Sequence, residues 1–252
     1  MSYINPPSET YQNISHKTFY SQILSHEIGY NIYLPLGYDE GGERYPVVYH
    51  IHGWMGNESS ELLPMEKIYR SREAVTVFVN AISLEKNDYI IALLQIETLV
   101  VKELIPHIEG NYLTSAIREN RMISGFSMGG AIAFYYAVKY PDIFGSVTSY
   151  AGTYHHQFHK DYNGVGEPVE KAAGLYKAMM EDETYLYEEG ILFLLRQNAD
   201  KIRGKLYIDI HIGTGDILIC ENEIMHMYLD SLNIPHEYKS YKGIGHELDK
   251  IV

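Results

Sequence analysis

Cysteine is almost missing from this sequence, and long apolar runs are missing altogether. The single cysteine, Cys220, cannot form a disulfide within the chain, which is typical of proteins from a reducing compartment. No stretch reaches the roughly 18 apolar residues that a membrane-spanning helix needs, and residues 1–10 lack the basic segment and apolar run of a signal peptide. We therefore expect a cytoplasmic protein that does not enter the membrane.

Basic residues are also scarce. The chain has 20 Lys and Arg against 33 Asp and Glu, a formal net charge of -13. An acidic surface repels phosphate backbones and anionic lipids, so we expect neither nucleic acid nor a membrane as a partner. The 46% hydrophobic and 21% charged residues are those of an ordinary globular protein, and 252 residues suit a single domain.

Strand-like and helix-like segments alternate from about residue 46 to the end, without a repeat, a low-complexity tract or a linker. This alternation predicts an α/β fold with a mostly parallel central sheet and helices on both faces. Lys17–Ser25 and Gly29–Leu34 would add an antiparallel hairpin at one edge of the sheet. The other predicted strands are Val47–Ile51, Val75–Val79, Arg121–Ser124, Gly145–Ser149, Leu206–Ile212 and His236–Tyr241, and the predicted helices are Glu61–Arg70, Gln95–Ile108, Met128–Tyr140 and Leu218–Leu232.

Gly125-Phe126-Ser127-Met128-Gly129 is a G-x-S-x-G pentapeptide between a strand-like and a helix-like segment. In this context the pattern predicts a nucleophile elbow, a sharp turn that holds a serine hydroxyl out at the carboxyl end of the sheet. The two glycines let the chain turn and let the strand approach the helix. Ser127 is therefore the candidate nucleophile.

A serine hydroxyl needs a base to take its proton, and after a nucleophile elbow the acid and then the histidine follow along the chain. Asp216 follows Leu206–Ile212 through Gly213-Thr214-Gly215, and His246 follows the last strand through Gly243-Ile244-Gly245. Both residues come after strand ends, where substrates bind in open α/β sheets. The rival acids are less well placed, because they lie within a strand (Asp209) or in the following helix (Glu221, Glu223).

An acyl-transfer site also needs donors for the oxyanion, usually two backbone N–H groups. Met128, the residue after the serine, would supply one donor. His52-Gly53-Trp54-Met55-Gly56 follows an early strand and has the His-Gly composition of the second donor loop, which indicates the amide of Trp54. We interpret His52 as a residue that braces this loop rather than as the base.

Six blocks in sequence order resemble the esterase D-like family of α/β-hydrolases, which includes feruloyl and acetyl-xylan esterases, S-formylglutathione hydrolases, enterochelin esterases and mycolyltransferases. The blocks are Tyr30–Pro35 with Gly37-Tyr38, Tyr45–Tyr49 leading into His52-Gly53, Glu103–Pro106, Gly125–Gly130, Gly213–Asp216 and Gly245-His246. The resemblance covers nearly the whole chain. It implies ester hydrolysis through an acyl-enzyme, no metal and no organic cofactor, and the same roles for Ser127, Asp216 and His246.

The resemblance leaves the substrate open. A feruloyl or acetyl ester of a carbohydrate is one expectation, and a small-molecule ester is another. Two other functions are compatible with the same residues: an acyltransferase that uses an alcohol in place of water, and a binding protein without catalysis. The sequence departs from the family pattern at two places that bear on the shape of the pocket. The segment after Val77–Asn80 is short and poor in glycine, and Glu247-Leu248 follow the histidine where many relatives have an aromatic residue.

The connection Thr153–Lys205 places about fifty residues between two predicted strands, where one helix and a few loop residues would be enough. We expect a helical insertion over one end of the sheet that shapes the binding site, with Tyr154, His155 and Phe158 as substrate contacts. His155 and His159 would share a helix face and could bind a metal. No cysteine or carboxylate stands at a matching spacing, so we expect a surface cluster there, and we expect Cys220 to be a small core residue.

Overall fold

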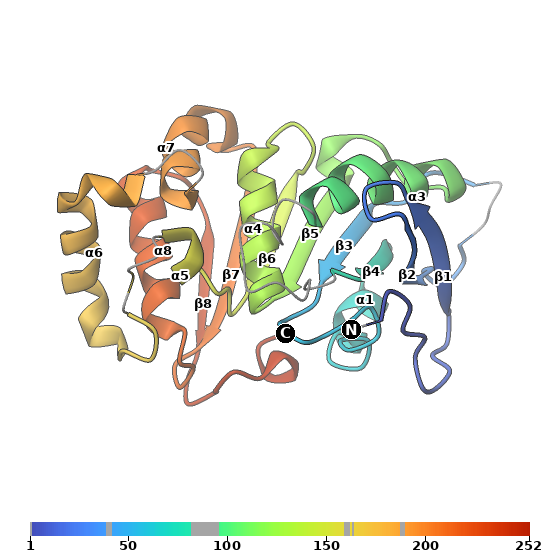
Figure 1. Ribbon diagram of the computed structural model, residues 1–252, viewed down its shortest axis with the longest axis horizontal. Coiled ribbons are helices and arrows are strands. Elements are labelled where there is room, and N and C mark those ends of the chain that lie inside the picture. Colours follow the sequence, from blue (N-terminus) through green and yellow to red (C-terminus); the bar gives the residue numbers. More distant parts are fainter. Residues whose placement is uncertain (1, 39–41, 82–95, 159–161, 163, 187–189) are drawn as a thin grey trace.

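The computed structural model describes residues 2–38, 42–81, 96–158, 162, 164–186 and 190–252, and within these residues a single eight-stranded sheet runs through the molecule. Its strand order is β1-β2-β4-β3-β5-β6-β7-β8 (Figure 1). The strands are β1 (Ile14–Ser21), β2 (His26–Tyr33), β3 (Val47–Ile51), β4 (Val75–Val79), β5 (Arg121–Phe126), β6 (Ser146–Tyr150), β7 (Tyr207–Gly213) and β8 (Glu237–Tyr241).

The six strands β3 to β8 are parallel, whereas β1 and β2 form an antiparallel hairpin that joins the sheet through β2 and β4. The predicted mostly parallel sheet with an N-terminal antiparallel pair is confirmed. The predicted bounds of the hairpin were wrong. β1 ends at Ser21, which pairs with His26, because the residues between them form the turn and Ser25 takes a positive φ of 54°.

The helices are α1 (Glu66–Ser71), η1 (Thr98–Leu104, of the π type), α3 (Ile105–Asn111), η2 (Arg118–Asn120), α4 (Met128–Lys139), α5 (His155–Phe158), η3 (Val169–Lys171), α6 (Ala172–Glu181), η4 (Glu183–Leu186), α7 (Ile191–Ile202), α8 (Ile219–Ser231) and η5 (Leu248–Lys250). Two predicted helices have different bounds. Glu61 lies in a turn, and α1 begins only after Pro64, a residue that suits a helix start but not a helix interior. The predicted helix Gln95–Ile108 changes from π to α geometry next to Pro106, and Gln95 itself lies outside the described residues.

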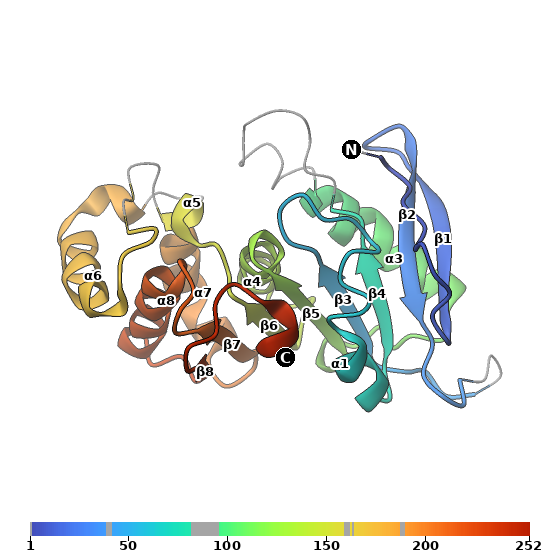
Figure 2. The same ribbon diagram turned by 90° about the horizontal axis from the view of Figure 1, so that it is seen from below.

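Helices cover both faces of the sheet (Figure 2). One face packs against η1, α3, α4, α7 and α8 in the larger core, and the other packs against α1 and the C-terminal segment in a smaller core. In β4, Val75, Val77 and Val79 belong to the larger core while Phe78 belongs to the smaller one. Successive strand side chains point to opposite faces, so a strand covered on both sides is apolar throughout.

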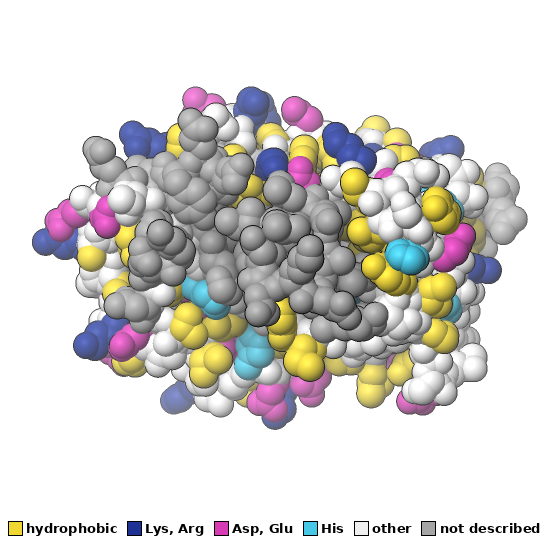
Figure 3. All heavy atoms as spheres, in the orientation of Figure 1, with side chains coloured by type: hydrophobic (Ala, Val, Ile, Leu, Met, Phe, Trp, Pro, Cys, Tyr) yellow, Lys and Arg dark blue, Asp and Glu magenta, His cyan; other side chains and the backbone are white. Residues whose placement is uncertain are grey.

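The connection between β6 and β7 contains α5, α6 and α7. α7 packs against α4 on the sheet, and α6 packs against α8 at the outer end of the molecule (Figure 1). Among the described helices, none has the length and apolar character needed to cross a lipid bilayer. On the face drawn in Figure 3, acidic and basic side chains are interspersed around the periphery of the described part.

Candidate active site

Ser127 is the turn residue between β5 and α4. Its backbone has φ 54° and ψ −118°, a conformation that a residue other than glycine adopts only when its surroundings impose it. The Ser127 N–H donates to the carbonyl of Tyr150 (2.8 Å), and the Ser127 carbonyl accepts from Ala131 (3.1 Å) and Thr153 (3.1 Å). Neighbouring strands and the first turn of α4 therefore hold the strained residue in place.

The glycines of the pentapeptide are required by close packing. A Cβ at Gly129 would lie 2.0 Å from the carbonyl oxygen of Ile51, and a Cβ at Gly125 would lie 2.3 Å from the backbone of Gly129. Both distances are far inside van der Waals contact. α4 can therefore approach β3 and β5 only because these positions carry no side chain, and this approach places Ser127 at the carboxyl end of the sheet.

His246 is hydrogen-bonded to Asp216. Its Nδ1 lies 2.7 Å from Asp216 Oδ2, and the other oxygen of Asp216, which is 3% exposed, accepts from the Leu218 N–H at 2.9 Å. The ring of His246 also packs on Phe126, with 4.6 Å between ring centroids. The carboxylate accepts a hydrogen bond from the Nδ1 N–H, so in the neutral imidazole Nε2 keeps its lone pair.

The loops that carry Asp216 and His246 are packed directly against each other. The Gly215 N–H donates to the Ile244 carbonyl at 2.9 Å, and a Cβ at Gly213 would lie 2.1 Å from the same oxygen. The glycine at position 213 thus permits a contact that a side chain would block. This contact fixes the distance between the carboxylate and the imidazole.

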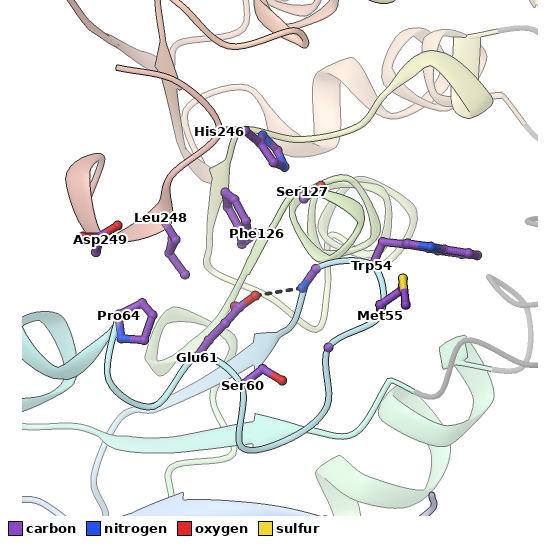
Figure 4. Close-up of a pocket in the computed structure, with 12 residues that line it drawn as sticks. Trp54, Met55, Ser60, Glu61, Pro64, Phe126, Ser127, His246, Leu248 and Asp249 are labelled. Carbon is purple, nitrogen blue, oxygen red and sulfur yellow. Dashed lines mark hydrogen bonds between the residues drawn. The ribbon is translucent and has the colours of Figure 1, made fainter. Parts of the chain in front are cut away.

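Ser127 and His246 line one cavity of about 540 Å³ at the carboxyl end of the sheet (Figure 4). The cavity is lined by Gly53, Trp54, Met55, Gly56, Ser60, Glu61, Pro64, Phe126, Ser127, His246, Leu248 and Asp249. The lining comes from the loop after β3, from the elbow and from the C-terminal segment. Among the described residues of the connection between β6 and β7, none lines this cavity, but Thr153 reaches the nucleophile, with its Oγ1 3.3 Å from Ser127 Oγ. Trp54 (59% exposed) and Met55 (74% exposed) place apolar surface at the cavity.

Glu61, a residue that the sequence did not single out, joins the loop after β3 to the sheet. Its Oε1 accepts from the Gly53 N–H (2.8 Å), and its Oε2 lies 2.6 Å from Nε2 of His50. The other nitrogen of His50 lies 2.9 Å from Ser124 Oγ on β5. The Gly53 amide is therefore occupied, whereas none of the hydrogen bonds among the described residues uses the N–H of Trp54.

His52 braces the same loop, as predicted. Its Nε2 accepts from the Ala81 N–H (3.1 Å), so Nδ1 carries the proton and donates to the Gly53 carbonyl (2.7 Å). Burial lowers the pKa of His52 in spite of the hydrogen bond to Gly53. A neutral imidazole with one donor and one acceptor fits both contacts, and it is not available as a base for Ser127.

The predicted substrate contacts Tyr154 and Phe158 are corrected by the structure, which places both side chains in the core at 0% exposure. Tyr154 packs on Phe134 and Phe158 and donates its hydroxyl to Ser149 Oγ (2.7 Å). Aromatic rings contribute large apolar surfaces to a core, and a buried tyrosine hydroxyl usually finds a partner, as Tyr154 does in Ser149. His155 is partly exposed but contacts Glu221, through its backbone N–H and through Nδ1 at 3.2 Å.

Two of the three rival acids are engaged elsewhere. Asp209 pairs with Lys239 (2.8 Å), and although burial raises the pKa of Asp209, contacts with His211 and Lys239 outweigh it and the pKa is lowered. Glu221 is fully buried beside His155, and burial raises its pKa. Cys220 is buried in the core, as predicted. His159, part of the predicted histidine cluster, lies outside the described residues.

A parallel sheet with antiparallel strands at one edge, a serine on a strained strand-to-helix turn and a histidine on a later loop together define an α/β-hydrolase fold. A solved ferulic acid esterase shares this fold, with a TM-score of 0.72 and 22% identity over 94% of this chain and 91% of that one. An S-formylglutathione hydrolase from Staphylococcus aureus shares it with a TM-score of 0.66 and 16% identity, over 93% and 92% of the two chains.

The chain belongs to the Esterase family, described as "Putative esterase", whose profile it matches over residues 21–249. An endo-1,4-beta-xylanase/feruloyl esterase of Xylanibacter ruminicola is 33% identical in an alignment of 150 residues that covers 53% of this chain and 20% of that protein. The chain thus spans a fifth of the length of this curated relative. The resemblance to esterase D-like hydrolases is confirmed.

Proposed function

We propose that the chain is a serine carboxylesterase with Ser127 as nucleophile, His246 as general base and Asp216 as the group that orients the base. The observation that carries the proposal is the shared cavity of Ser127 and His246, combined with the 2.7 Å contact from His246 Nδ1 to Asp216. Such a carboxylate selects the imidazole tautomer whose free nitrogen can accept the serine proton, and it stabilises the imidazolium that forms.

The reaction follows from these roles. Ser127 Oγ attacks the ester carbonyl while His246 takes its proton, and His246 then returns that proton to the departing alcohol, which leaves an acyl-enzyme. Water enters, gives a proton to His246 and attacks the acyl carbon. Collapse of the second tetrahedral intermediate releases the acid and returns the proton from His246 to Ser127.

Two backbone amides are suited to the oxyanion that forms in each step. Met128 is the first residue of α4, a buried twelve-residue helix, so its N–H lies at the positive end of the helix dipole. On the loop after β3 the Gly53 N–H donates to Glu61, which leaves the Trp54 amide as the second donor. We assign Trp54 as the second donor because none of the hydrogen bonds among the described residues uses its N–H.

For the substrate we propose a feruloyl or acetyl ester of a carbohydrate. The names of the relatives include a feruloyl esterase and a ferulic acid esterase. The cavity offers Trp54, Met55, Pro64 and Leu248 as apolar surface for an aromatic acyl group, next to the polar side chains of Ser60 and Asp249. Aromatic surface beside a few polar groups is typical of sites for such ligands.

The test combines covalent labelling with an ester panel. A fluorophosphonate should label the wild-type chain once, at Ser127, and should not label Ser127→Ala. Hydrolysis of methyl ferulate, p-nitrophenyl acetate and acetylated xylo-oligosaccharides then ranks the acyl groups. A folded protein that neither reacts with the fluorophosphonate nor hydrolyses any ester of the panel would refute the proposal.

A further inference from the structure

Three side chains of types that can bind a metal meet at the edge of the sheet, far from Ser127. His226 and Asp230 stand one turn apart on α8, and His236 comes directly before β8. One ligand atom from each of the three residues lies within 4.8 Å of the others. His246 follows the carboxyl end of β8, so the length of that five-residue strand, roughly 16 Å, separates this group from the cavity.

The two imidazoles are in direct contact. Nδ1 of His226 lies 2.6 Å from Nε2 of His236, so a proton or a cation must stand between the two lone pairs. Nδ1 of His236 is 2.8 Å from the carbonyl of Ile234, and only an N–H can make that contact. The contact fixes the tautomer of His236 and leaves Nε2 as a lone pair directed at His226, the arrangement typical of metal-ligating histidines.

The remaining contacts hold the group in place while leaving it open. The ring of His226 stacks on Tyr238 with centroids 4.5 Å apart and an angle of 2° between the planes. Its Nε2 lies 3.6 Å from Asp230 Oδ2, where the Asp230 side chain is 64% exposed. His236 also lines a separate cavity of about 320 Å³ with Tyr207 and Pro235. An ion and its water ligands can therefore reach the imidazoles from solvent.

We propose that His226, Asp230 and His236 bind one Zn²⁺ ion, with water completing a tetrahedral site. Two imidazoles and one carboxylate suit zinc, whereas Mg²⁺ and Ca²⁺ prefer oxygen ligands alone. Zinc takes the place of the proton shared by the imidazoles, and the rings separate to about 3.4 Å between nitrogens, the value for two ligands at 2.0–2.1 Å from a tetrahedral ion. Binding releases that proton to solvent.

The ion would link the last turn of α8 to the start of β8. The loop with Asp216 leads into α8, and the loop with His246 leaves β8, so the link joins the two elements that carry these loops. It would stabilise the folded chain without touching the reacting atoms. The folded-to-unfolded ratio rises by a factor of one plus the ratio of free zinc to Kd, which is about 100-fold at a zinc concentration of 100 Kd.

The experiment measures thermal unfolding and calorimetric zinc binding of the full chain after removal of metals with EDTA and dialysis. For the wild type we expect one zinc ion per chain and a rise in Tm with ZnCl₂, but no rise with MgCl₂ or CaCl₂. His236→Gln should lose this response. Asp230→Asn changes an exposed side chain and should bind zinc about tenfold or more weakly. His26→Gln is the matched control, because His26 is an exposed histidine of β2 whose ring stacks on Tyr3.

Three results would overturn the proposal. They are a wild-type Tm that does not respond to zinc, a response equal for Mg²⁺ and Zn²⁺, and zinc binding of unchanged affinity in both His236→Gln and Asp230→Asn. Ester hydrolysis is not part of this readout, so the zinc site and the proposed function stand or fall separately.

Discussion

Truncation of Glu61 tests whether this carboxylate positions the oxyanion loop. In Glu61→Ala, the Gly53 N–H and His50 both lose a buried partner, at 2.8 Å and 2.6 Å respectively. An unpaired buried donor costs about 1–3 kcal/mol. Glu61 lines the cavity, so water can enter the space that the side chain leaves and reach one of the two donors. We therefore expect the free energy of unfolding to fall by about 1–3 kcal/mol in total, rather than by twice that amount.

The kinetic effect should exceed what this loss of stability explains. Without Glu61 the Gly53 peptide is free to turn, and the Trp54 N–H that follows moves with it. Complete removal of one oxyanion donor lowers kcat by about 10² to 10³. A misplaced donor keeps part of its effect, so we expect a fall in kcat of about 10- to 100-fold, or about 1.4–2.8 kcal/mol in the barrier, with little change in KM.

Glu61→Gln should restore most of the activity. The glutamine oxygen can accept from Gly53, and its NH₂ can donate to Nε2 of His50 if the His50 proton moves to Nδ1, which faces Ser124 Oγ. Glu66→Ala is the matched control, since Glu66 is a partly exposed carboxylate of α1 that pairs with Arg70. The assays are steady-state hydrolysis of p-nitrophenyl acetate and urea unfolding. A folded Glu61→Ala variant with wild-type kcat would refute the reasoning.

Three further predictions concern the nucleophile, the acid and the loop. Ser127→Ala should lower kcat for p-nitrophenyl acetate by about 10⁴-fold or more with an unchanged circular dichroism spectrum, and Asp216→Asn should lower it by about 10⁴-fold because the amide favours the wrong tautomer of His246. Burial lowers the pKa of His52, so the folded state binds fewer protons there than the unfolded state. The contribution of neutral His52 to the free energy of unfolding is fully present above pH 6.5, and it is lost as the pH falls from 6.5 through the lowered pKa. Urea unfolding should therefore show that the free energy of unfolding falls less from pH 7.5 to pH 5.5 in His52→Gln than in the wild type. The amide oxygen of the glutamine can still accept from Ala81. A decrease as large as that of the wild type would contradict this assignment.

Much of the fold could be predicted from the sequence because its signals are local. Apolar runs such as Val47–Ile51 and Val75–Val79 became strands that are buried throughout. The pentapeptide around Ser127 combines glycine spacing with a strand before it and a helix after it, and each part constrains the others. Asp216 and His246 could be chosen in advance because parallel strands bring their carboxyl ends to one edge of the sheet.

Other features depended on packing between segments far apart in the sequence, and only the tertiary structure decided them. Nothing near Glu61 indicates that its carboxylate meets Gly53, because that contact depends on the path of the loop after β3. From the sequence, the aromatic ring of Tyr154 could equally have faced a substrate or the core. In the structure it packs against Phe134 and is buried in the core. His226 and His236 are ten positions apart in the sequence, which is no typical metal-binding spacing, and the packing of α8 beside β8 brings them together. Periodicity and turn residues determine elements along the chain, whereas the contacts of a single polar or aromatic side chain depend on which elements pack against it.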